Sequence, residues 1–140
     1  MIRSLRTALL TAFVLVACTA PAARDHSHPQ NASVKPEVDS LLTWAARDFH
    51  TNRGSYPARL RNVRSGYFVM ADGSRQHRLC GEFLPAQQGG TAEWVRFATI
   101  TTDPYEQWLG GSAAPYCDAS VTWDQGDLSS LLQSRLDALR

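Results

Sequence analysis

Glu93-Trp94-Val95-Arg96-Phe97-Ala98-Thr99-Ile100-Thr101 is the stretch that decides the fold, because most of its residues are β-branched or aromatic and favour a strand. Residues 60–69 carry apolar side chains on both alternating faces and predict a second strand, and residues 79–84 predict a third. Ala71-Asp72-Gly73-Ser74 lies between these two, and Asp-Gly readily supplies the positive φ angles of a type I′ turn. The two stretches are therefore expected to pair as a β-hairpin.

The remaining strand signals are less uniform. Gly81, inside the third predicted strand, indicates a β-bulge or a close approach of another chain segment. Gln87-Gln88-Gly89-Gly90 predicts a turn before the stretch that starts at Glu93. Residues 105–109 are ambiguous, and residues 116–123 predict a last strand that carries Cys117.

Amphipathic helices are expected on either side of this strand region. Residues 36–49 place apolar side chains at helical spacing, and Pro36 suits the first turn of a helix. Asp127 is placed to cap a second helix whose apolar residues are Leu128, Leu131, Leu132, Leu136 and Leu139. A helix, three or four antiparallel strands and a helix predict an α+β fold with both helices on one face of the sheet.

The first 17 residues have the order of a secretory signal peptide. Arg3 and Arg6 provide a positive start, and an apolar run follows from Thr7 to Ala17. This run is shorter than the about 20 residues that a permanent transmembrane helix needs. Ala17 is the small residue expected before a cleavage site, so residues 1–17 are predicted to be removed.

Leu15-Val16-Ala17-Cys18 resembles the lipobox of bacterial lipoproteins. The resemblance implies that the Cys18 thiol receives a diacylglycerol, that the chain is cut before Cys18, and that the new amino group is acylated with a fatty acid such as palmitate. Two or three acyl chains would then hold the protein on a membrane. Thr19, which is not Asp, implies the outer membrane, with the domain facing the periplasm. The alternative is an ordinary signal peptide, which is cut near Ala20, Ala22 or Ala23 and discards Cys18.

The processed chain is expected to consist of a tether and one domain. Residues 18–33 form the lipidated N-terminus and a tether that is rich in Pro, Ala and small polar residues. Residues 34–140 are enough for one hydrophobic core and too few for two. His26 and His28 lie in the tether without rigid support, so a solvated linker is expected there and not a metal site. We predict no metal and no cofactor.

The number of cysteines supports a disulfide in this domain. Once Cys18 is assigned to lipid, Cys80 and Cys117 remain as an even pair in an oxidising compartment. Neither lies in a Cys-x-x-Cys or His-rich setting, which argues against redox catalysis and zinc binding. A structural disulfide is the expected outcome.

Charge is nearly balanced but unevenly distributed. Loss of Arg3 and Arg6 leaves 12 of the 14 basic side chains against 13 acidic ones, so no nucleic-acid partner is expected. Arginines gather between Arg47 and Arg78 at positions 47, 53, 59, 61, 64, 75 and 78, whereas most acids lie between Glu82 and Asp127. Either a basic face meets an anionic partner, or the two halves pair across one sheet and neutralise each other.

Residues 54–63, followed by Cys80-Gly81-Glu82, resemble a group of small exported proteobacterial proteins whose activity is uncharacterised. That group carries Asp-Pro-x-Ser-Ala-x-Phe-Arg-x-Val and then Cys-Gly-Glu-Val-Asn-Ala before a Gly-rich, aromatic stretch. The matching residues here are Ala58, Leu60, Arg61, Val63, Cys80, Gly81 and Glu82, and Gly89, Gly90, Trp94 and Phe97 echo the last part. The departures are Gly54, Ser55, Pro57, Leu84 and Pro85. The resemblance implies a helix-plus-sheet fold and no established activity.

No recognised catalytic motif is present in the sequence. The titratable candidates are His50, His77, Glu82 and Glu93, and the histidines are more simply explained as structural. The aromatic candidates for a glycan or peptide groove are Trp94, Tyr105, Trp108, Tyr116 and Trp123, although such residues commonly form the core of a small domain.

Three functions remain open at this stage. The first is an envelope lipoprotein that is not an enzyme and binds another protein, a cell-wall component or the membrane. The second is an enzyme acting on envelope polymers, with Glu82 or Glu93 as acid or base and a second carboxylate about 5–9.5 Å away. The third is a lysozyme-inhibitor-like lipoprotein, but those proteins resemble all-β barrels, and two helices argue against that class.

Overall fold

The computed structural model describes residues 34–52, 56–86, 93–118 and 120–140. Its sheet is antiparallel, has five strands and runs in the order β4-β3-β2-β1-β5. The strands are β1 (Pro57–Val69), β2 (Arg75–Pro85), β3 (Val95–Thr101), β4 (Tyr105–Leu109) and β5 (Thr122–Trp123). The helices are α1 (Pro36–Thr51), the 3-10 helix η2 (Gly110–Ala113), α2 (Ala114–Cys117) and α3 (Ser129–Asp137). The predicted α+β class is therefore confirmed, with one strand more than the upper estimate.

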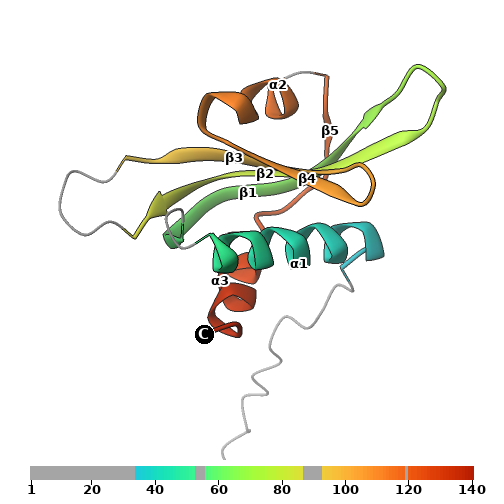
Figure 1. Ribbon diagram of the computed structural model, residues 1–140. Coiled ribbons are helices and arrows are strands. Elements are labelled where there is room, and N and C mark those ends of the chain that lie inside the picture. The colour runs from blue at the N-terminus through green and yellow to red at the C-terminus, as the bar shows by residue number, and fades with distance from the viewer. Residues whose placement is uncertain (1–33, 53–55, 87–92, 119) are drawn as a thin grey trace, which may run out of the picture. The chain divides into compact units, whose positions relative to one another are not determined.

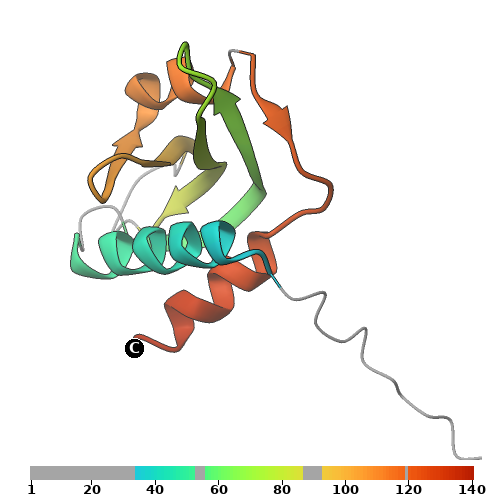
Figure 2. The ribbon, with the colours of Figure 1, turned by 90° about the vertical axis from the view of Figure 1, so that its right-hand side faces the viewer.

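The sheet separates two layers of helices. Helices α1 and α3 cover one face, and η2 and α2 lie over part of the other face (Figure 1). Strand β5 pairs with β1 at the edge of the sheet, and the chain passes through it from α2 to α3 (Figure 2). This crossing carries the C-terminal segment from one face to the other.

Helix α1 forms where the apolar spacing predicts it. Pro36 lies in its first turn, and its buried residues are Val38, Leu41, Leu42, Ala45, Ala46 and Phe49. The Phe49 ring lies 4.9 Å from that of Phe83 and 5.2 Å from that of Phe97, between ring centroids. Burial of each such side chain contributes about 1.5–3 kcal/mol, so this layer holds the main core.

Helix α3 is shorter than the leucine pattern indicates. Leu132 and Leu136 are fully buried, whereas Leu139 is 39% exposed and lies beyond the end of the helix. The predicted cap is displaced by one residue: the N-cap position is Leu128, and Asp127 precedes it. Asp127 Oδ1 still accepts hydrogen bonds from the backbone N and the Oγ of Ser129, the first residue of the helix.

The predicted hairpin is present, but the predicted turn type is wrong. Gly73 has a φ of +83°, whereas Asp72 is not among the described residues with positive φ. Met70 N donates to Ser74 O, and Gly73 N donates to Met70 O, which defines a three-residue loop closed by Gly73. Asp72 Oδ1 accepts bonds from Ser74 N and Ser74 Oγ, which stabilises this loop in place of a two-residue type I′ turn.

Cys117 does not lie in a strand, which corrects the prediction for residues 116–123. It ends helix α2, and only Thr122 and Trp123 pair with β1. Pro115 explains the difference, because proline fits the first turn of a helix and cannot donate to a β ladder. Residues 105–109, which the sequence left ambiguous, form β4 beside β3.

Several predictions lie outside the described residues. These are the signal peptide, Cys18, the tether with His26 and His28, Arg53 and the turn at residues 87–90. In the described part of the chain, no helix has the length and apolar character needed to cross a membrane.

Candidate functional site

A groove of about 550 Å³ opens on the sheet face opposite α1 and α3. Strands β1, β2 and β3 form its floor, while the end of α2, β5 and the turn before α3 form its walls. Its lining residues are Asn62, Arg64, Cys80, Gly81, Glu82, Arg96, Cys117, Asp118, Trp123, Gly126 and Asp127. Six parts of the chain thus contribute to one concave surface.

A β-bulge in β1 decides which arginines reach this face. Arg61 pairs with Glu82 and Arg64 pairs with Cys80, so β1 has one residue more than β2 between these two pairs. Asn62 takes up the extra residue with a φ of 54°, in the left-handed region that Asn tolerates. Arg61 and Arg64 therefore share the groove face although three positions separate them. A strict period of two would place them on opposite faces.

The predicted disulfide is present and braces the groove. Cys80 and Cys117 are bonded, with Cα atoms 5.9 Å apart, and they join β2 to the end of α2. Arg78, buried beneath α2, donates from Nη1 to Tyr116 O at 2.9 Å and fixes the same helix. The wall that carries Asp118 is thereby held against the sheet.

Two ion pairs neutralise acids of the groove. Arg61 Nε lies 2.8 Å from Glu82 Oε2, which also accepts a bond from Asn62 Nδ2 at 3.0 Å. The hydrogen bond from Arg61 lowers the pKa of Glu82 below its usual range. Arg96 Nη1 lies 2.8 Å from Asp118 Oδ2. The predicted neutralisation between the basic and acidic halves is found in the Arg61–Glu82 pair, whereas Arg96 and Asp118 both belong to the acidic half.

Other arginines rest on aromatic rings. The guanidinium carbon of Arg64 lies 4.6 Å from the Trp123 ring centroid, and that of Arg75 lies 4.5 Å from the Tyr67 centroid. The guanidinium carbon of Arg61 lies 4.0 Å from the Trp94 ring centroid, and that of Arg59 lies 5.9 Å from it. Within the described ranges, Arg59, Arg64 and Arg75 have no carboxylate within 4.0 Å. The basic half therefore keeps some unpaired charge.

The candidate acid–base residues do not assemble into a catalytic pair. Glu82 lies in the groove but is held ionised, whereas a general acid needs a raised pKa. Glu93 is exposed and outside the groove lining. His50 lies in the last turn of α1, and His77 lies on β2 with its ring 6.0 Å from that of Tyr67. The described ranges contain no group of three or more His, Cys, Asp or Glu placed to hold a metal ion.

The five candidate aromatics divide into two sets. Tyr105 stacks on Trp44 at 4.9 Å and donates its hydroxyl to Asp48. Trp108 stacks on Tyr116 at 5.5 Å, and both pack against the buried residues beneath η2 and α2. Trp94 and Trp123 instead carry arginines on the groove face. Only Trp123 lines the groove itself.

Comparisons with protein-family models, with curated proteins and with solved structures found no match. The chemistry of the groove and the N-terminal sequence therefore carry the functional argument.

Proposed function

We propose that the chain is a lipid-anchored protein of the bacterial cell envelope whose domain is a binding module and not an enzyme. The lipobox-like Leu15-Val16-Ala17-Cys18 and the tether that follows support the anchor. A disulfide in the domain suits the oxidising periplasm. The groove supports the binding role.

The charge arrangement of the groove is the observation that carries this proposal. Glu82 and Asp118 each meet a cation of the chain itself, whereas Arg64 does not meet an acid in the described residues. The lowered pKa of Glu82 is the reverse of what a glycosidase acid requires. An arginine held beside an open groove is suited to recognition.

The anchor is tested by following the fatty acid. Cells that express the full chain are grown with alkyne-tagged palmitate, and the protein is analysed by mass spectrometry. The wild type is expected to carry the label on an N-terminal Cys18, and Cys18→Ser is expected to carry none. A mature N-terminus at or beyond Ala20 would contradict the proposal, because Cys18 would then have been discarded.

The binding role is tested with a photoreactive amino acid placed in the groove at the exposed Asp118, and at Gln133 on the opposite face as the matched control. In intact cells, adducts are expected from position 118 and not from position 133. Purified wild-type protein is also incubated with envelope polymers, and no soluble product is expected. Equal adducts at the two positions, or a product that Glu82→Gln abolishes, would contradict a non-catalytic binding module.

A further inference from the structure

We infer that the groove binds an anionic glycan and that Arg64 binds its carboxylate or phosphate group. This inference rests on the proposed binding role of the domain and does not depend on the lipid anchor. Four observations support it: the state of Arg64, the platform beneath it, the size of the groove and the composition of its lining.

Arg64 differs from the other cations at the groove. Arg61 and Arg96 are each engaged by a carboxylate at 2.8 Å. Arg64 is exposed, and its guanidinium carbon lies over the Trp123 ring. In the described residues its side chain makes no hydrogen bond or ion pair, so its N–H donors are open to two oxygens of a carboxylate or phosphate. An anion therefore has an unoccupied partner here.

The platform beneath Arg64 is fixed before any ligand arrives. Trp123 lies against Gly66, where an added Cβ would come within 2.7 Å of Thr122 O and 2.9 Å of the indole ring. Gly66 is thus the residue that lets β5 and its indole approach β1 so closely. An arginine on an immobile ring loses less conformational freedom when it binds, which favours affinity.

The size of the groove indicates a ligand larger than a simple ion. A volume of about 550 Å³ falls within the range of small-molecule sites. Around Arg64 the lining provides an amide at Asn62 and carboxylates at Asp118 and Asp127. Amides and carboxylates accept hydrogen bonds from hydroxyl groups, which a sugar presents in number.

The composition of the lining argues against a peptide, an acyl chain or a nucleic acid. Among the described residues the lining contains no Leu, Ile, Val, Met or Phe, and its less polar members are Trp123, the disulfide and two glycines. Peptides and acyl chains bind through apolar pockets that such side chains form. Of the two lining arginines, Arg96 is paired with Asp118, so Arg64 alone is open to an anion in the described lining, which is too few cations for a polyphosphate backbone.

The test measures the affinity of the full chain, purified in detergent, for matched probes by calorimetry. The carboxylated probe is the disaccharide of N-acetylglucosamine and N-acetylmuramic acid, and its neutral counterpart is N,N′-diacetylchitobiose. N-Acetylglucosamine 6-phosphate against N-acetylglucosamine forms the phosphate arm, and triglutamate is the peptide arm. The wild type is expected to bind at least one anionic sugar about tenfold more tightly than its neutral partner. The arm that shows the preference identifies the anion.

Arg64→Gln is expected to abolish this preference for the anionic sugar. Arg64→Lys keeps the charge but cannot donate two parallel N–H bonds, so it is expected to retain part of the preference. Arg75→Gln is the matched control, because Arg75 also stacks on an aromatic ring but lies outside the groove. The circular dichroism of each variant reports whether it is folded.

The inference is overturned if neither anionic sugar is preferred, if Arg75→Gln weakens binding as much as Arg64→Gln, or if triglutamate binds as tightly as the preferred sugar. If groove-specific adducts form in cells and any of these results is obtained, the domain is still a binding module, but its ligand is not an anionic glycan. If no groove-specific adducts form either, both proposals are wrong.

Discussion

Asn62 forms the β-bulge that shifts the alternation of side chains along β1. With its left-handed φ of 54° it absorbs one extra residue, so that Arg61 and Arg64 both point to the groove while Val63 stays in the core. Opposite this bulge lies Gly81, which has no side chain to compete for the same space. Gly81 and Val63, which follows Asn62, therefore pack closely on the core side of the sheet.

Replacement of Gly81 by Ala tests how tightly this pair is packed. An added Cβ would lie 2.8 Å from the Phe97 ring and 2.8 Å from Val63 Cγ2, closer than real Cβ contacts allow. Both neighbours are fully buried, so we expect a loss of about 1–3 kcal/mol in the free energy of unfolding, measured with urea. Gly111→Ala is the control, because nothing lies within 4 Å of its added Cβ. Equal stability of the two variants would refute the close packing.

Asp124 makes a pH-dependent contact among three parts of the domain. Its carboxylate accepts hydrogen bonds from Lys35 Nζ at 2.7 Å and from the buried Ser65 Oγ at 2.9 Å. The bond from Lys35, together with that from Ser65, lowers the pKa of Asp124 below its usual value of 3.8. A depressed folded-state pKa stabilises the fold above the unfolded value, and this stability is lost as the pH falls through the folded value.

The Asp124→Asn variant should therefore be less stable than the wild type at neutral pH, by about 1 kcal/mol for the weakened hydrogen bonds. This difference should shrink as the pH falls from about 5 to 2, because the wild type then loses its own charged contact. Urea unfolding at several pH values measures it. Glu93→Gln, at an exposed site, removes one carboxylate as a control. A difference that stays constant down to pH 2 would contradict the role of the charged form.

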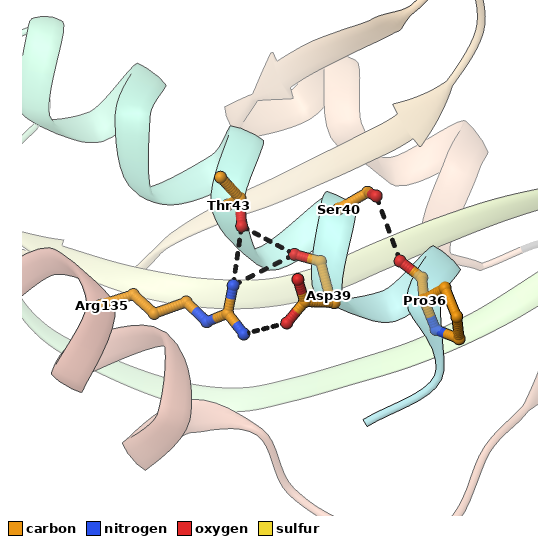
Figure 3. Close-up of polar contacts among 5 residues, drawn as sticks. All are labelled: Pro36, Asp39, Ser40, Thr43 and Arg135. Carbon is orange, nitrogen blue, oxygen red and sulfur yellow. Dashed lines mark hydrogen bonds and ion pairs between the residues drawn. The ribbon is translucent and has the colours of Figure 1, made fainter. Parts of the chain in front are cut away.

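At the scale of elements, Arg135 joins the two helices that cover the core. Its Nη1 donates to Thr43 Oγ1 at 2.7 Å and to Asp39 O at 3.2 Å, and its Nη2 donates to Asp39 Oδ1 (Figure 3). Three acceptors on α1 thus meet one guanidinium on α3. The planar guanidinium of arginine has several N–H donors and can therefore bind all three acceptors at once.

Arg135→Lys should weaken this junction although it keeps the charge. A single ammonium cannot reach all three acceptors, so we expect the free energy of unfolding to fall by about 1 kcal/mol. Arg47→Lys, an exposed arginine on the same α1, should change it by less than about 0.5 kcal/mol. If both variants unfold at the wild-type urea concentration, α1 and α3 are held by apolar packing alone.

The elements that the sequence predicts well are those with a regular period. The stripe of α1 and the strand after Glu93 repeat their pattern over several turns or residues, and the structure confirms both. Cys117 was misplaced because Pro115 and its disulfide, not strand propensity, fix its segment as a helix. The sequence offers Trp123 as a candidate for a groove, but it does not predict Arg64 beside it, because a bulge changes the face of Arg64 and a distant strand brings Trp123 beneath it.

At the scale of the whole molecule, the disulfide ties the sheet to the helix layer on the groove side. It joins β2, whose other face carries the core residues Leu79 and Phe83, to α2. The closed loop runs from Cys80 to Cys117 and contains β3, β4 and η2, whereas β5 and α3 follow it in the chain. The disulfide therefore holds the groove wall at α2 directly, and α3 is held by its packing in the core.

Removal of this bond by the double change Cys80→Ala and Cys117→Ala should affect both stability and binding. A bridge across a sequence separation of 37 residues restricts the unfolded chain. Its loss should lower the free energy of unfolding by roughly 4 kcal/mol in the chain-entropy model, a large part of the about 5–15 kcal/mol typical of a domain.

The same double change should also weaken the binding of the anionic sugar. Asp118 follows Cys117 directly, so the groove wall that carries Asp118 should loosen. Urea unfolding and calorimetry measure the two effects, and Cys18→Ser, which leaves the bridge intact, should show neither. Unchanged stability in the double variant would mean that Arg78 and the packing of Tyr116 suffice to hold α2 on the sheet.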